Sequence, residues 1–191
     1  MVVAHLRVNP DGTQSLHSLE DHLSSTASRA KTCAAPFSSQ AWAELAGLWH
    51  DLGKYRPGFQ RYIRQANDPD AHVEGRIAGP EKTHSAAGAL HALDILKCKC
   101  GRAGGIAAHV LAYIIAGFHP GLDDWHKGLK ARLDGENAKH AEAEAVSSST
   151  RSSLSTSAKH AHAEAVAAAS VEFRAREASQ RQFRNITNVR A

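Results

Sequence analysis

Apolar residues recur at helical spacing in several segments of this 191-residue chain, and glycine or proline interrupts the pattern between most of them. These segments are predicted as helices over residues 18–33, 39–51, 57–65, 83–98 and 105–117. No segment alternates polar and apolar residues convincingly, so no strand is predicted. Helices that each bury one apolar stripe pack on one another, and the predicted fold class is therefore all-α.

The boundaries of these helices are marked by individual residues. Ser18, followed by Asp21 three positions later, resembles a capping box, and Pro36 breaks the first helix. Residues 1–15 are expected to be an extended or irregular lead with a turn at 9–12. Residues 66–82 are predicted to be a loop.

The composition changes near residue 134. The sequence KHAEAEAV at 139–146 recurs as KHAHAEAV at 159–166, around a serine-rich stretch. Its apolar residues are too small to bury much surface, so a loosely docked helix or disorder is expected. We therefore predict a main domain over 1–133 and a tail over 134–191.

Composition also bears on the setting of the protein. No stretch of about 18 apolar residues occurs, so no membrane span is predicted and no membrane partner is expected. The N-terminus lacks the features of a secretory signal, and the three cysteines are sparse, which favours a reduced, cytoplasmic location. The net charge of +4 is compatible with a polyanionic partner.

Histidine is the unusual residue type, with 13 copies. The pair His50-Asp51 ends a predicted helix, and an imidazole beside a carboxylate suits a divalent metal ion. His22, His84 and His119 lie on or at the ends of three other predicted helices. Any one of these histidines is more often a core or surface residue than a ligand. Four helices that each offer a histidine nevertheless indicate a metal site inside a helical bundle.

The order of these residues resembles the HD superfamily of metal-dependent phosphohydrolases. The closer resemblance is to the HD nuclease domain of the CRISPR-associated helicase-nuclease of type I systems. It covers about residues 4–125 and rests on Ala4-His5, LEDHL at 19–23, GLWHDLGKYRPGFQ at 47–60, THSAAGA at 83–89 and IAGFHPGL at 115–122. The run His-Asp-x-Gly-Lys followed by Phe59-Gln60 is specific to that branch.

The resemblance implies an HD-domain helical bundle with a metal site in its core. It implies that His22, His50 and Asp51 hold one ion, and that Asp51 bridges to a second ion held by His84 and His119. Ligands of these types admit Mn, Fe, Co, Ni or Zn, as one or two ions.

The implied activity is metal-dependent endonucleolytic cleavage of single-stranded DNA in CRISPR interference, an antiviral defence. Its partners would be a helicase that is not in this chain and an RNA-guided effector complex. Asp51 and Lys54 are the candidate catalytic residues, with Lys54 facing the scissile phosphate. The alternative for Lys54 is a solvated cation near the C-terminal end of a helix dipole.

The chain departs from the family pattern in two places. The family usually has two consecutive histidines followed by Gly-Gly, whereas this chain has Phe118-His119-Pro120-Gly121. The family also supplies a late aspartate to the first ion, but no Asp follows Asp134, and Glu172 lies in the most apolar setting among the late glutamates. The chain also has no glycine-rich phosphate loop. We therefore expect an excised domain, a truncated product or a frameshifted copy whose foreign tail starts near residue 134.

Two other functions remain open at this point. The chain could be another HD phosphohydrolase that acts on a nucleotide or a cyclic nucleotide. It could also be a catalytically incomplete HD remnant that serves as a helical interaction module, as Phe118 and the missing late aspartate suggest.

Overall fold

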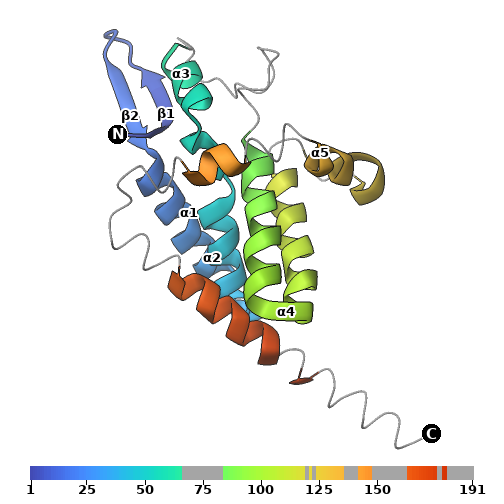
Figure 1. Ribbon diagram of the computed structural model, residues 1–191. Helices are drawn as coiled ribbons and strands as arrows, with labels where there is room; N and C mark the ends of the chain where they lie inside the picture. Colours follow the sequence, from blue (N-terminus) through green and yellow to red (C-terminus); the bar gives the residue numbers. More distant parts are fainter. Residues whose placement is uncertain are drawn as a thin grey trace, which may run out of the picture.

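The computed structural model describes residues 1–65, 84–118, 121, 124–135, 142–147, 163–175 and 178–179. Over these residues the chain is mostly helical, with one small two-stranded sheet (Figure 1), so the predicted all-α fold class is confirmed. The predicted loop at 66–82 and the candidate ligand His119 lie outside the described residues. No helix among the described residues is long and apolar enough to cross a membrane.

The N-terminal segment forms a β-hairpin, which corrects the prediction that the chain has no strand. Strand β1 (Val3–Val8) pairs with strand β2 (Gln14–Ser18) in antiparallel register. The turn between them falls where proline, aspartate and glycine were expected to make one, with Gly12 at a φ of 81°. The alternation of buried and exposed residues is confined to β1, because β2 is largely exposed. That is why the pattern was too short to predict a strand.

Helices α1, α2 and α3 form where helical spacing predicts them. Helix α1 (Leu19–Cys33) begins at Ser18, whose side chain accepts a hydrogen bond from the backbone N–H of Asp21, as expected for this cap. Helix α2 (Gln40–Trp49) and helix α3 (Pro57–Gln65) follow, joined by the short 3-10 turn η2 (Leu52–Tyr55). The end of α2 therefore leads directly into η2, and His50-Asp51 lies between them.

Helix α4 (Ser85–Gly117) spans the two segments predicted as separate helices over 83–98 and 105–117. The chain reverses direction between these two segments. Figure 1 shows its two halves side by side. A Cβ on Gly88 would lie 3.2 Å from Cγ2 of Ile115, whereas a straight helix would separate these residues by about 40 Å. Both ends of α4 therefore lie at the same end of the molecule.

Two glycines allow α4 to approach the end of α2 very closely. A Cβ on Gly88 would collide with the backbone carbonyl of Trp49, and a Cβ on Gly53 would collide with the backbone of His84. Gly88, one of the small residues after His84, therefore lets the end of α2 approach α4 closely. These contacts bring the start of α4 against the His50-Asp51 segment.

The main core lies between α2, both halves of α4 and a helical segment of the tail. Its large, fully buried side chains include Leu45, Trp49, Leu111 and Ile115. A π-helical turn, η5 (Trp125–Leu129), adds Leu129 to this core, and helix α5 (Lys130–Asp134) adds Leu133. A smaller core joins the hairpin to α3 through Val3, Leu6, Phe59, Tyr62 and Ile63.

Parts of the predicted tail pack against buried clusters of the main domain. The helical residues 163–175 add Ala165, Val166 and Ala169 to the main core. The helical residues 142–147 add Ala145 to a separate cluster that includes Leu19 and Leu52. Phe173 stacks on Trp42 near the start of α2, with ring centroids 5.0 Å apart. The division of the chain at residues 133 and 134 stays a prediction.

Candidate metal centre

Three elements bring three potential ligands together at one end of the bundle. His22 lies in the second turn of α1, His50 is the C-cap of α2, and Asp51 precedes η2. His50 and Asp51 are buried, at 5% and 1% exposed, and His22 is partly buried. Together the three residues form a cluster that could hold a metal ion. This is the set that the family resemblance implies for a first ion.

The ligand atoms of this cluster converge closely. Nε2 of His22 lies 3.1 Å from Nε2 of His50 and 3.0 Å from Oδ2 of Asp51, and the latter two atoms are 3.2 Å apart. Neighbouring ligands about 2.1 Å from a six-coordinate ion lie about 3.0 Å apart, and those around a tetrahedral ion about 3.4 Å apart. The triangle therefore fits one face of an ion's coordination shell. Two imidazoles and one carboxylate on such a face leave further positions open.

A backbone contact fixes the orientation of the His50 ring. Nδ1 of His50 lies 2.8 Å from the carbonyl oxygen of Gly47. Because a carbonyl only accepts, Nδ1 carries the proton of the neutral ring, and Nε2 presents its lone pair to Asp51 and His22. A hydrogen bond of this kind behind a histidine ligand is the usual way in which proteins orient the ring toward a metal.

The second carboxylate oxygen of Asp51 faces a different histidine. Nε2 of His84 lies 3.3 Å from Oδ1 of Asp51, and His84 is 4% exposed at the N-cap of α4. The two oxygens therefore face different imidazoles, which is the arrangement that a bridging carboxylate needs. His119, predicted to share the second ion, lies outside the described residues.

Lys54 is buried beside Asp51, so it is not the solvated helix-end cation considered from the sequence. Its side chain is 5% exposed, and Nζ lies 2.9 Å from Oδ2 of Asp51. Nζ also donates a 3.4 Å hydrogen bond to the carbonyl of Ala4. A buried carboxylate requires such compensation. Lys54 thus places a positive charge at the centre of the site.

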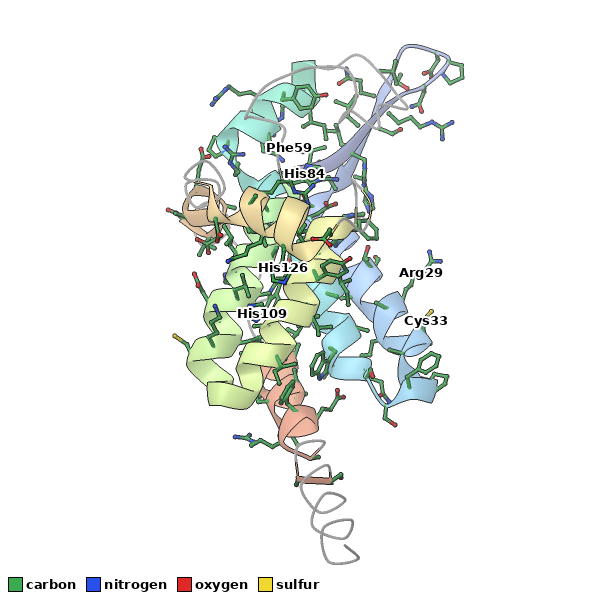
Figure 2. The ribbon with its side chains drawn as sticks, turned by 90° about the vertical axis from the view of Figure 1, so that its right-hand side faces the viewer. Arg29, Cys33, Phe59, His84, His109 and His126 are labelled. Atoms are coloured by element: carbon green, nitrogen blue, oxygen red, sulfur yellow. The ribbon has the colours of Figure 1, made fainter. Side chains whose placement is uncertain are left out.

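Phe59 and Gln60, the pair that follows the His-Asp-x-Gly-Lys run, support the site from α3. The Phe59 ring meets the His84 ring edge-on at 5.0 Å, and Figure 2 shows the two side by side. Gln60 donates to the carbonyls of Val3 and Lys54, at 2.9 and 2.7 Å, and accepts from the N–H of Val3. It therefore ties strand β1 to the turn that carries Lys54.

Phe118 occupies the position where the family pattern has another histidine. Its ring lies 5.2 Å from the His50 ring, edge-on, and the residue is 61% exposed. Phe118 therefore covers one side of His50 and leaves an aromatic ring open to solvent at the rim of the site. His109, on the same half of α4, is exposed, and its Nδ1 lies 2.6 Å from the carbonyl of Gly105 (Figure 2).

Three of the described late acidic residues have partners outside the cluster. Glu172 accepts a 3.1 Å hydrogen bond from the backbone N–H of Ala41, about 14 Å along α2 from His50 by the helical rise. Glu144 pairs with Arg56 at 2.8 Å, and Asp124 accepts from the N–H of His126. Glu172 therefore does not supply the late acidic ligand, and no described residue after Asp51 joins the cluster.

Two further histidines lie beside this centre, and neither was predicted to be a ligand. His5 on β1 and His17 on β2 form a second potential metal-binding group with His22. Partial desolvation of the His5 ring, followed by the positive charge of Lys54 and the neighbouring His22, lowers the pKa of His5 to about 4, although the residue as a whole is exposed. In the sequence, His5 stands out only as part of the Ala4-His5 motif. The turn at 9–12, read as a hairpin, would have placed His5 and His17 on neighbouring strands.

Comparison with known families finds no family model that matches this chain, and no curated protein matches it.

Proposed function

We propose that this chain is a metal-dependent nuclease domain that cleaves single-stranded DNA in CRISPR interference, together with a helicase outside the chain and an RNA-guided effector complex. One observation carries the proposal: two imidazole nitrogens and a carboxylate oxygen converge within 3.2 Å at the buried Asp51. The sequence resemblance supplies the substrate and the partners. The donor set suits one or two ions of Mn, Fe, Co, Ni or Zn.

The residues around Asp51 suit phosphodiester hydrolysis. A bound divalent ion would activate a water molecule and neutralise charge on the phosphodiester during in-line displacement. Asp51 would bind that ion through Oδ2. Its Oδ1 faces His84 and could bind a second ion there. Lys54 holds its ammonium group 2.9 Å from Asp51, where it can stabilise the charge that develops on the phosphate.

The exposure of the site suggests how a single strand would enter. Among the three site histidines and the aspartate that the structure describes, His22 has the most exposed side chain, at 18%, against 2% for Asp51 and 5% for His84. Phe118 adds an exposed ring beside His50. Unpaired bases stack on exposed aromatic rings, whereas paired bases are not available for stacking. This feature favours a single-stranded substrate.

The test is cleavage of labelled single-stranded DNA by the full chain in the presence of Mn²⁺ or Co²⁺. Asp51→Asn keeps the shape of the side chain but removes its charge. We expect it to lower the cleavage rate by at least about a hundredfold, because even the loss of an outer partner of a metal ligand costs 10- to 100-fold. Asp134→Asn, at the exposed end of α5, is the matched control. Chelation should abolish cleavage, and cleavage by Asp51→Asn at the control rate would overturn the proposal.

A second candidate function is a non-catalytic interaction module. Two observations favour it: Phe118 replaces a histidine at the rim, and Glu172 and Glu144 are engaged elsewhere. This alternative predicts that the purified protein retains no transition metal after reconstitution and dialysis. A retained ion that is lost in Asp51→Asn would exclude it.

A further inference from the structure

Three histidine rings from three elements meet beside the buried centre. His5 on β1 stacks against His17 on β2, with ring centroids 6.0 Å apart and planes 26° apart. His22 on α1 meets both rings edge-on, at 4.7 Å from His5 and 5.6 Å from His17. One ring nitrogen from each residue lies within 4.8 Å of the other two.

The backbone fixes this grouping. His5 and His17 are direct partners in the strand register, so their side chains leave the same face of the hairpin. The register shifts between Val3 and His5, which skips Ala4. Ala4 is buried while His5 is exposed, and a bulge at this position sets which side chain faces outward. Strand β2 then runs through Ser18 directly into α1, which carries His22.

The chemistry of this group differs from that of the buried cluster. It offers three imidazoles and no carboxylate, and His5 and His17 are exposed to solvent while His22 is partly buried. Imidazole nitrogen suits Zn, Ni, Co and Cu(II), whereas Mg, Ca and Mn prefer oxygen ligands. Solvent can fill the remaining coordination positions of an ion bound at this surface.

We propose that His5, His17 and His22 form a second, outer metal site that binds a divalent ion of the Zn, Ni, Co or Cu class. His22 belongs to both the outer and the buried group. With both ions bound, it would lose its ring proton and bridge them as an imidazolate, one nitrogen to each ion. The outer site does not require Asp51 or the nuclease activity. A bound ion there would join the hairpin to α1.

The test is a Co²⁺ titration of the untagged full chain, with bound metal counted after equilibrium dialysis and followed by cobalt absorption. His17→Thr removes one outer ligand from an exposed strand position and keeps a residue that favours strands. We expect this variant to bind one equivalent of Co²⁺ fewer than the wild type. His126→Ala removes an exposed histidine outside both groups and should bind as the wild type does (Figure 2).

Two further variants distinguish Co²⁺ binding at the buried site from binding at the outer site. Asp51→Asn should keep the equivalent that His17→Thr loses, and His22→Ala should lose it. Equal Co²⁺ binding by His17→Thr and the wild type would overturn the proposal, as would complete loss of binding in Asp51→Asn. Because DNA cleavage is not measured, failure of the nuclease proposal would leave this result unchanged.

Discussion

Asp51 has a different set of partners at each of its two oxygens. Oδ2 lies 2.9 Å from Nζ of Lys54 and within 3.2 Å of the Nε2 atoms of His22 and His50. Oδ1 lies 3.3 Å from Nε2 of His84. These contacts offset the desolvation penalty of the buried carboxylate only while their distances and directions are kept. Substitutions around Asp51 should therefore change the charge of a side chain and keep its size and shape.

Lys54→Met removes the ammonium group and keeps the length of the side chain. We expect kcat for DNA cleavage to fall by about 10²–10³, the usual effect of removing one group that stabilises transition-state charge. Metal affinity should stay equal or increase, because the change removes a cation that contacts Asp51. Single-turnover kinetics and metal titration measure the two effects. Lys97→Met, at an exposed position of α4, is the control, and loss of metal binding in Lys54→Met would show a positioning role instead.

Phe118→Ala removes the exposed ring at the rim of the site. Stacking of one base on an aromatic side chain contributes about 1–3 kcal/mol. We therefore expect the KM for single-stranded DNA to rise by about 5- to 150-fold with a smaller change in kcat, since 1.4 kcal/mol is a factor of ten. Phe37→Ala, at another exposed phenylalanine, is the control. An unchanged KM would mean that Phe118 does not contact the strand.

At the scale of elements, the site depends on how closely α2, η2 and α4 approach one another. Gly88 sits against the carbonyl of Trp49, and Gly53 sits against the backbone of His84. These contacts lie one residue before His50 and two residues after Asp51, so they set the position of the metal-binding segment relative to His84. A methyl group at either glycine would separate the elements that carry the ligands.

Gly88→Ala tests this close approach. In an open helix, the change from glycine to alanine stabilises a protein by up to about 1 kcal/mol. At Gly88 we expect the opposite sign, because the added Cβ would collide with the backbone of Trp49. Gly105→Ala, on the same helix with no atom within 4 Å of the added Cβ, is the matched control and should be neutral or stabilising. Urea unfolding measures both, and equal shifts for the two variants would contradict the prediction.

The sequence predicts elements well where one pattern decides the structure, and less well where two segments must meet. Ser18, Pro57 and the helical spacing locate α1 to α3 closely. The hairpin was missed because β2 buries almost nothing and so has no apolar alternation to read. The second histidine group was missed for the same reason: His5 and His17 are 12 positions apart and meet only through strand pairing.

At the scale of the whole molecule, the tail helix 163–175 and the candidate site lie at opposite ends of the bundle. The helix crosses the end away from the hairpin, next to the start of α2 (Figure 1). There Glu172 accepts a hydrogen bond from Ala41, in the first turn of α2, where Ser39 makes no side-chain cap. The sequence could not predict this role, because the two residues are 131 positions apart.

Glu172→Ala should therefore destabilise the fold without affecting metal binding. Loss of a cap at a helix N-terminus costs about 0.5–2 kcal/mol, and we expect a decrease in the free energy of unfolding in this range. Glu164→Ala, at an exposed position on the same helix, is the control and should change stability little. Chemical denaturation measures both. If the two variants were equally stable, the hydrogen bond between Glu172 and α2 would not contribute to stability.

The reversal of α4 has a consequence for how this chain can be altered. His84 precedes the helix and Phe118 follows it, and both contact the same centre. The point of reversal lies about 25 Å away along either half, from the rise of about 17 residues. Insertions are tolerated best where the chain turns far from a packed functional site. A reporter peptide or a small domain placed at this turn would extend the bundle at its far end and leave both contacts to the centre in place.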